Sequence, residues 1–363
     1  MATISDYLTS LQNDLATAKT NLANLGVEVL ETDTFTEISE KMANIETGGG
    51  SITDFLLLEA EPTHYLNNAY HNTGLLSILK EIPAIKWNGV YENGATQYSL
   101  SNYFLGATNL KKIDLSNFEN MDKVNSMSYM FYSCDNLEEI IGIDNFSFDN
   151  LTYVSYMFDG CRSLKNVNNF IKKISNQTIL YIASMFRNCE AIEDITFDEN
   201  FLDPTYTSGV TMETFCSNCL SLKTINIPCS GYISGMRYAF QNCRELTTIN
   251  MSNLDFTPIR GNTSSSSSTD VFAGNIKLEN LSFGLNYGAG FTTSLSANNR
   301  YATLDLSACT LLTHDSLMDV INKLYDLTAN GKNNQKLVIG TTNMAKLTEE
   351  EIAIATNKGW IVS

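Results

Sequence analysis

The residues best suited to chemistry are the cysteines, and five of the eight recur at intervals of 27, 28, 30 and 24 residues. They are Cys134, Cys161, Cys189, Cys219 and Cys243. Zinc sites draw cysteines in closely spaced pairs, with a second pair or histidines nearby. Only Cys216 and Cys219 have the spacing of such a pair. We therefore expect no metal site, and the regular spacing calls for a search for internal repeats.

The other reactive residues form no known catalytic motif. His64, His71 and His314 have no neighbouring serine, cysteine or carboxylate in a pattern that activates a nucleophile. The three glycines at 48–50 lack the lysine and the hydroxyl residue of a phosphate loop and indicate a hinge. The glutamates at 349–351 follow Thr348, a helix N-cap, and suit helix capping. We expect neither enzyme activity nor a cofactor.

The composition excludes some classes of binding partner. The chain has 40 acidic and 23 basic residues and a formal charge of −17, which repels phosphate backbones. We therefore expect no nucleic-acid partner. No segment approaches the roughly 20 apolar residues of a membrane span, so membrane insertion is not expected. The first residues lack a basic region followed by an apolar stretch, so no secretory signal is expected either.

The cysteines belong to a repeat that reads [M/Y/A]-F-x-x-C-x-x-L-x-x-I. Close copies start at Phe131, Phe158, Phe186 and Phe240, and degenerate copies start at Phe104, Cys216 and Phe272. Such a period indicates stacked units that each complete the apolar face of the next. The cysteine is then a small packing residue in an inward position, and we expect its thiol to be reduced.

Each repeat predicts a strand and a short helix. The end of the unit alternates as a strand does, for example at Leu110, Ile113 and Leu115. Seven such strands would stack in parallel at about 4.8 Å per rung. The preceding segment, with Met127, Met130 and Phe131, has helical spacing and predicts a turn or two of helix behind the sheet.

The repeat resembles the bacterial leucine-rich repeats of the BspA-like surface-protein group, over residues 98–285. The resemblance implies an α/β solenoid, a leucine-rich-repeat domain with a parallel sheet. It implies an interaction scaffold and names no particular ligand.

The N-terminal segment carries an unbroken apolar heptad at Ile4, Leu8, Leu11, Leu15, Ala18, Leu22 and Leu25. Such a stripe predicts a coiled coil and a parallel homo-oligomer. Its a and d residues specify neither a trimer nor a dimer, and a trimer is the favoured expectation. A second amphipathic helix is predicted from about Thr34. The alternative is a helical hairpin folded onto the rest of the chain.

Residues 1–50 also resemble the leader of structural proteins from phages and prophages of low-GC Gram-positive bacteria. That resemblance implies a virion location, assembly in the host cytoplasm and attachment to other virion proteins through the N-terminal helices. The function expected from it is a fibre, tail or head-decoration protein that displays the repeat domain for host attachment. The alternative is a bacterial cell-surface leucine-rich-repeat adhesin.

The last segment predicts an α+β cap for the solenoid. Its expected elements are a strand at 302–306, a helix at 315–327, a strand at 336–339, a helix at 349–357 and a strand at 360–362. The predicted domains are helices at 1–47, a hinge at 48–51, an adaptor at 52–97, the solenoid at 98–306 and the cap at 307–363.

We expect ligand binding on the solvent face of the strands, at the residue between the last two inward positions of each unit. The polar residues there are Asp114, Asn168, Thr196, Asn226, Asn250 and Ser282, and Ile141 and Asp305 hold the same position in two further units. Hydroxyl and amide groups suit a host cell-surface glycan or protein. An ordinary solvated sheet face would have the same composition.

Overall fold

The computed structural model describes residues 98–363, apart from 117, 119–120, 144–145, 175–178, 260–269 and 291–302. Before residue 98 it describes 15–16, 18–20, 29–30, 32–34, 37 and 81–82. The predicted coiled coil, hinge and adaptor therefore lie largely outside the described residues. Of the seven heptad residues, Leu15 and Ala18 are described, and both have helical conformation. Thr34 and Glu37 exchange the hydrogen bonds of a capping box, at the predicted start of the second helix.

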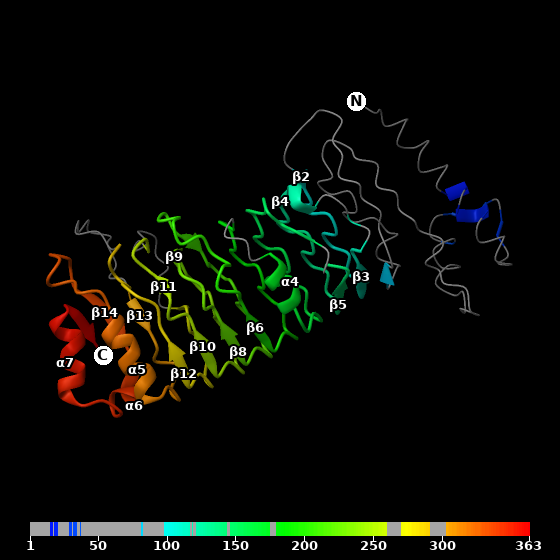
Figure 1. The fold of residues 1–363 in the computed structure, drawn as a ribbon. Helices are drawn as coiled ribbons and strands as arrows, with labels where there is room; N and C mark the ends of the chain where they lie inside the picture. Colours follow the sequence, from blue (N-terminus) through cyan, green and yellow to red (C-terminus); the bar gives the residue numbers. More distant parts are fainter. Residues whose placement is uncertain are drawn as a thin grey trace.

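The repeats form a solenoid whose main sheet is parallel throughout (Figure 1). One part of the sheet has the order β1 (Glu81–Ile82), β3 (Lys112–Asp114) and β5 (Glu139–Ile141). The other has the order β12 (Asn280–Ser282), β10 (Thr248–Asn250), β8 (Thr224–Asn226) and β6 (Asp194–Thr196). The central aliphatic residue of most strands is buried, as at Ile195 and Ile249. The predicted leucine-rich-repeat type of solenoid is thus confirmed.

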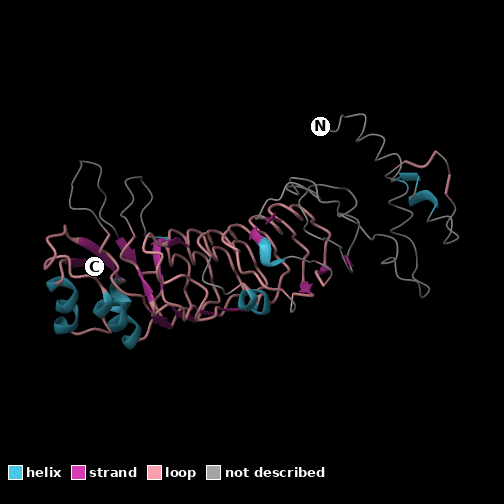
Figure 2. Ribbon diagram, turned by 45° about the horizontal axis from the view of Figure 1, so that its top comes forward, coloured by secondary structure: helices cyan, strands magenta, loops and turns pink. Residues whose placement is uncertain are grey.

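A second parallel ladder, which the sequence did not predict, joins the coils on the other side. Its strands are β2 (Tyr98–Ser99), β4 (Val124–Ser126), β7 (Val210–Thr211), β9 (Gly231–Gly235) and β11 (Leu254–Asp255). Single bridges at Tyr153 and Tyr181 connect β4 with β7. A short 3-10 helix, η2 (Met121–Lys123), precedes β4. Figure 2 shows the coils stacked side by side, with the C-terminal helices at one end.

The predicted helix between the two ladders is wrong, because that segment is a series of turns. The N–H groups of Met127, Tyr129 and Phe131 donate to carbonyls of the next coil at 2.8–3.1 Å. Those of Met130 and Tyr132 donate three residues back, at 3.1 Å. An α-helix would direct every N–H four residues back within its own segment. Tyr129 and Ser133 adopt positive φ angles of 60° and 56°, which helical residues do not. The turns therefore stack as a further hydrogen-bonded ladder.

Each repeat cysteine packs inward and donates a hydrogen bond to the preceding coil. The thiol of Cys161 donates to the carbonyl of Phe131 at 3.1 Å, and that carbonyl also accepts from the N–H of Cys134. Equivalent thiol bonds start at Cys134, Cys189, Cys219 and Cys243, at 3.0–3.1 Å. The neighbouring phenylalanine rings stack, as Phe131 and Phe158 do at 5.6 Å. The cysteine position thus combines small volume with a donor for the second lone pair of a buried carbonyl.

One coil leaves the main sheet. After β5, α4 (Asn168–Lys173) begins where a strand was predicted, and Val167 is both its N-cap and the buried inward residue of that coil. The cause is local, since asparagines at 166, 168 and 169 favour turns and helix starts over strands. The side chain of Asn168 replaces one of the missing main-chain hydrogen bonds, because it accepts from the N–H of Thr196 at 2.9 Å. The predicted continuous sheet is therefore divided between β5 and β6.

The C-terminal elements agree closely with the prediction. They are β13 (Thr303–Asp305), α5 (His314–Lys323), β14 (Gln335–Val338), α7 (Glu349–Asn357) and β15 (Trp360–Val362). A short helix that was not predicted, α6 (Gly340–Met344), lies between β14 and α7. Thr348 and Glu351 form the capping box of α7. The three strands make a separate parallel sheet with β14 in the middle.

Helix α5 closes the end of the main sheet through its side chains. Leu281 donates its N–H to Ser316 Oγ at 2.9 Å, and Phe283 donates its N–H to Asp319 at 2.7 Å. Lys323 donates to the carbonyl of Phe283 at 2.9 Å. These groups take the place of a further strand and cover an edge that would otherwise be open.

We predict that Ser316→Ala lowers the free energy of unfolding by about 1–3 kcal/mol, because it leaves the buried N–H of Leu281 without its acceptor. Chemical denaturation with urea measures the change. Glu199→Gln, at an exposed turn, is the control and should stay within about 0.5 kcal/mol of the parent. Equal stabilities for the two variants would contradict the capping role.

We also predict that the folded protein resists thiol reagents. All eight cysteines are buried and free, and burial raises the pKa of Cys229 and Cys309 to about 12. Since the thiolate is the reactive form, no cysteine should react with Ellman's reagent at pH 8 within minutes, whereas all eight should react in guanidinium chloride. Rapid reaction of a cysteine in the folded state would show that its position opens to solvent.

Candidate binding surfaces

The first candidate surface is the solvent face of the second part of the main sheet, here called the polar face. Strand register aligns Thr196, Asn226, Asn250 and Ser282 in one row. A parallel row contains Asp194, Thr224, Thr248 and Asn280. Seven of these eight side chains are uncharged hydroxyl or amide groups. The polar face is therefore a flat array of hydrogen-bonding groups with rungs about 4.8 Å apart.

Part of this hydrogen-bonding capacity is used inside the protein. Asn250 Nδ2 donates to Asn226 Oδ1 at 2.7 Å, which fixes the orientation of both amides. Among the described residues, the hydroxyls of Thr224, Thr248 and Ser282 have no partner. Ion pairs border the face, such as Lys223 with Glu193 at 2.6 Å and Lys277 with Glu245 at 2.6 Å. The centre of the face thus offers neutral donors and acceptors to a ligand.

The structure brings together four of the six predicted polar residues, namely Thr196, Asn226, Asn250 and Ser282. Asp114 lies on β3, in the other part of the sheet, and accepts a hydrogen bond from the N–H of Ser116. Asn168 is the first residue of α4 and lies on no strand.

The outer members of the predicted row also lie elsewhere. Ile141 is on β5, and Asp305 is on β13, which pairs with β14 rather than with β12. The predicted row is interrupted twice because α4 and α5 each take the place of a strand.

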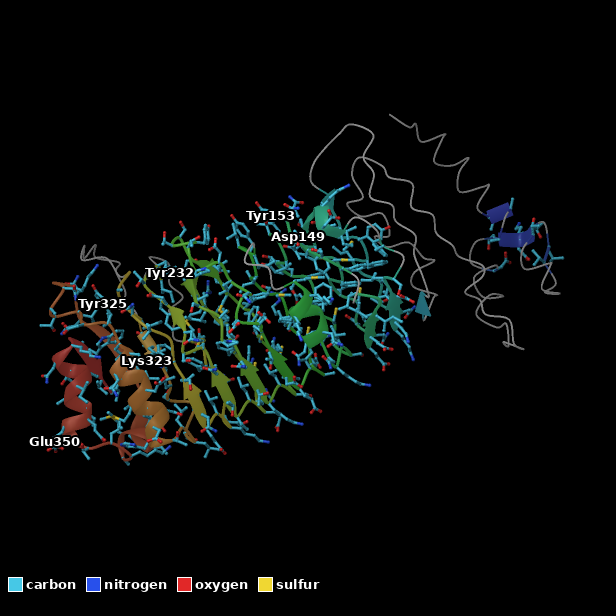
Figure 3. The ribbon with its side chains drawn as sticks, in the orientation of Figure 1. Asp149, Tyr153, Tyr232, Lys323, Tyr325 and Glu350 are labelled. Atoms are coloured by element: carbon cyan, nitrogen blue, oxygen red, sulfur yellow. The ribbon has the colours of Figure 1, made fainter. Side chains whose placement is uncertain are left out.

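A second surface, which the sequence reasoning missed, is formed by five tyrosines and here called the tyrosine patch. Tyr153 and Tyr181 lie on the opposite ladder, and Tyr129, Tyr132 and Tyr156 lie in the stacked turns. Tyr153 stacks on Tyr181 at 4.7 Å, and both are about 40% exposed (40% and 41%). Tyr129 stacks on Tyr156 at 4.6 Å and meets Tyr132 at 5.6 Å. Figure 3 places Tyr153 on the edge that carries β4 and β9, away from β8 and β10. A sequence signal was available, because Ser-Tyr-Met-Phe occurs twice, at 128–131 and 155–158.

A partly buried ion pair supports the tyrosine patch. The guanidinium of Arg187 lies 5.7 Å from the ring centre of Tyr156 and binds Asp159 at 2.6 and 2.8 Å. Asp159 is buried and also accepts a hydrogen bond from Asn188 at 3.0 Å. Burial raises the pKa of the Asp159 carboxyl, and the hydrogen bonds from Arg187 oppose that rise. The arrangement holds the rings in place and assigns no chemistry to the carboxyl.

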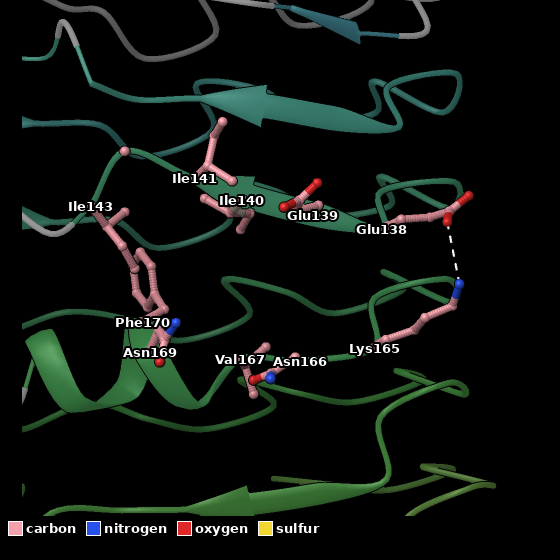
Figure 4. Close-up of a pocket in the computed structure, with 11 residues that line it drawn as sticks. Glu138, Glu139, Ile140, Ile141, Ile143, Lys165, Asn166, Val167, Asn169 and Phe170 are labelled. Atoms are coloured by element: carbon pink, nitrogen blue, oxygen red, sulfur yellow. Dashed lines mark hydrogen bonds and ion pairs between the residues drawn. The ribbon is translucent and has the colours of Figure 1, made fainter.

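The third candidate is a depression of about 260 Å³ between β5 and the start of α4 (Figure 4). Residues 138–143 line one side of it, and residues 165–167, 169 and 170 line the other. Lys165 and Glu138 form an ion pair of 3.3 Å at one end. Ile143 and Phe170 lie at the opposite end. The depression marks the place where the main sheet is divided.

Within the described ranges, no three His, Cys, Asp or Glu side chains lie close enough together to bind a metal ion. His314 is exposed and contacts Glu351 at 2.9 Å, and this hydrogen bond raises its pKa. The other two histidines, His64 and His71, lie outside the described residues. None of the helices that the structure describes has the length and apolarity needed to cross a bilayer.

Comparisons with known proteins give limited similarity. Residues 98–227 match a family described as "Mycoplasma protein of unknown function, DUF285". No curated protein matches the sequence.

Two solved structures are similar at low scores. A leucine-rich repeat protein from Bacteroides ovatus is 18% identical, with a TM-score of 0.35, over 72% of this chain and 59% of that one. A leucine-rich cell surface protein from Faecalibacterium prausnitzii is 12% identical, with a TM-score of 0.34, over 77% of this chain and 91% of that one. These scores carry no argument, so the fold rests on the ladders described above. Neither structure is a phage protein, and the expected phage resemblance gains no support from them.

Proposed function

We propose that this protein is a bacterial leucine-rich-repeat adhesin that binds a cell-surface glycan through the polar face. The observation that carries the proposal is the aligned array of Thr196, Asn226, Asn250 and Ser282, beside Thr224 and Thr248. Its hydroxyl and amide groups lie at fixed intervals and match the alternating donors and acceptors of sugar hydroxyls.

A glycan fits the polar face better than a protein does. The centre of a protein interface is usually enriched in apolar and aromatic side chains, and such groups are absent from the two rows of the polar face. The neutral centre also gives little attraction to a highly charged ligand. The tyrosine patch has the composition of a protein contact and is the second candidate surface.

The stacked coils suit this role because they hold the polar face rigid. Inward aliphatic residues are buried beneath each rung, and the Asn226–Asn250 hydrogen bond orders the amides before a ligand arrives. Binding to such a surface requires little ordering of side chains, so more of the interaction energy is retained as affinity. Binding, and no catalytic step, is the proposed activity.

The proposed location is the bacterial cell surface, and a virion is the competing location. The virion assignment depends on the heptad and the leader-like sequence of residues 1–50, which lie mostly outside the described residues. The homo-oligomer, with a trimer favoured over a dimer, depends on the same heptad. Attachment to other virion proteins belongs to the competing assignment.

We predict that the double variant Thr224→Arg, Thr248→Arg loses glycan binding at least tenfold, because two long charged side chains cover the middle of the polar face. A glycan array, followed by calorimetry on the strongest glycan, measures the loss. The matched control is Tyr153→Ser, Tyr181→Ser, which alters the opposite ladder and should bind as the parent does. Loss of binding in the control alone would move the site to the tyrosine patch.

We further predict that antibodies against residues 100–300 label the surface of the producing bacterium. Immunogold electron microscopy of intact cells and of induced phage particles from the same culture makes the comparison. Gold on the particles and none on the cells would establish the virion location instead.

A further inference from the structure

The polar face is limited to four rungs. Strands β6, β8, β10 and β12 lie side by side in one parallel sheet, and each contributes one residue to each of the two rows (Figure 1). At the β6 end, the adjoining coil forms α4 instead of a strand, and its Asn168 accepts from the N–H of Thr196. At the β12 end, Ser316 and Asp319 of α5 bind the main chain of the last rung. The array of side chains therefore stops at both ends.

The strip between the two rows of the polar face carries no side chain toward solvent. The residue between the rows on each strand directs its side chain into the core. These four residues, at most 2% exposed, are Ile195, Ile225, Ile249 and Leu281. Residues two apart on a strand are about 6.6 Å apart, and the rungs are about 4.8 Å apart. The two rows therefore form a lattice of polar groups with these two spacings.

An extended chain of β-1,4-linked pyranose sugars has similar dimensions. Its equatorial linkages keep the chain straight, and each sugar advances it by about 5.2 Å, close to the rung spacing of about 4.8 Å. The hydroxyl groups point sideways from the flat rings, and the two edges of the chain are about as far apart as the two rows. Over four sugars the difference in spacing adds up to about 1 Å, which rotation of the side chains accommodates.

The mixed chemistry of the rows also suits such a chain. Successive sugars are turned over relative to each other, so each row meets the 6-hydroxyl of one sugar and the 2- and 3-hydroxyls of the next. A row that meets both edges needs groups that donate and accept, and threonine, serine and asparagine side chains do both. Among the described residues, the hydroxyls of Thr224, Thr248 and Ser282 have no partner and are available for such contacts.

The charges at the polar face favour an uncharged chain. Asp194 is the one charged side chain of the two rows, and it lies at the β6 end. The lysines at the border are already paired, Lys223 with Glu193 and Lys277 with Glu245. The formal charge of −17 repels a chain of uronic acids. A neutral glycan meets neither a free cation to attract an anion nor this repulsion.

We propose that the polar face binds an uncharged, extended, β-1,4-linked glycan that lies across the strands, with one sugar on each of the four rungs. The inference rests on the proposed glycan binding, and it adds the linkage, the direction and the length of the bound segment. An α-1,4-linked chain of the same sugar curves away from a flat surface. A branched glycan does not place its sugars on successive rungs.

Two isomeric tetrasaccharides test the linkage. Cellotetraose and maltotetraose each contain four glucose units, and they differ only in having β-1,4 or α-1,4 linkages. Calorimetric titration of the full chain should give cellotetraose at least a tenfold higher affinity than maltotetraose. Equal affinities, or no binding of cellotetraose at millimolar concentration, overturn the inference. If other glycans still bind the polar face, the proposed function stands without this inference, and if no glycan binds, both fail.

A length series tests the limit of four rungs. From cellobiose to cellotetraose the affinity should rise at least twentyfold, because each added sugar reaches a further rung. From cellotetraose to cellohexaose it should rise no more than threefold, since the longer chain has three alternative positions on the same four rungs. A rise that ends at two sugars, or that continues at the same rate beyond four, contradicts one sugar per rung.

A variant at the last rung tests where the sugars lie. Ser282 is exposed on β12, and Ser282→Arg covers that rung and leaves three free. The variant should bind cellotriose within threefold of the parent, and it should bind cellotetraose no more than threefold better than cellotriose. The middle-rung variant Thr224→Arg, Thr248→Arg should lose both ligands at least tenfold.

An equal loss of cellotriose in the last-rung and middle-rung variants overturns the placement across the strands. Circular dichroism checks the fold of both variants. If either is unfolded, the length series on the parent protein decides the question.

Discussion

Hydrogen bonds between successive coils are the interaction on which the whole structure depends. They join the main sheet, the opposite ladder and the stacked turns, so most coils are held by their neighbours along several sides. A single coil could not bury its own apolar residues, and stability therefore belongs to the stack. The thiol bonds follow from the same geometry. They place a weak donor beside each carbonyl that already accepts from its own coil, as at Phe131.

The strands could be predicted from the sequence, but the turns could not. Strands follow from alternation around residues such as Ile195 and Ile225, which the core requires. The spacing of Met127, Met130 and Phe131 fits a helix equally well, and it misled the prediction. The useful signal was the position before the cysteine position of the repeat. It holds Gly106, Gly160 and Gly274, Asn188, Asn218 and Asn242, or Ser133, and it has positive φ throughout. Glycine and asparagine are the residues that tolerate this conformation best.

The candidate surfaces were predictable to the extent that they follow the repeat. The polar face comes from the same alternation as the core, so four of its residues were found from the sequence. The interruptions of the sheet depend on side chains that replace a strand, such as Ser316 and Asp319 of α5. No periodic pattern in the sequence indicates such side chains. Leu164 and Val167 satisfy the strand template even though their coil starts a helix. The asparagines beside Val167 decide its conformation.

The main sheet has three edges where the next strand is missing, at β12, β6 and β5, and they differ in which groups bind the open main-chain atoms. At β12, side chains of α5 bind the open groups, and at β6 the side chain of Asn168 binds the N–H of Thr196. At β5 no side chain of the described residues takes this role for Ile140. Exposed edges usually invite pairing between whole molecules. This edge lies inside the stack, with the coil of α4 beside it, so a second solenoid cannot approach it edge to edge.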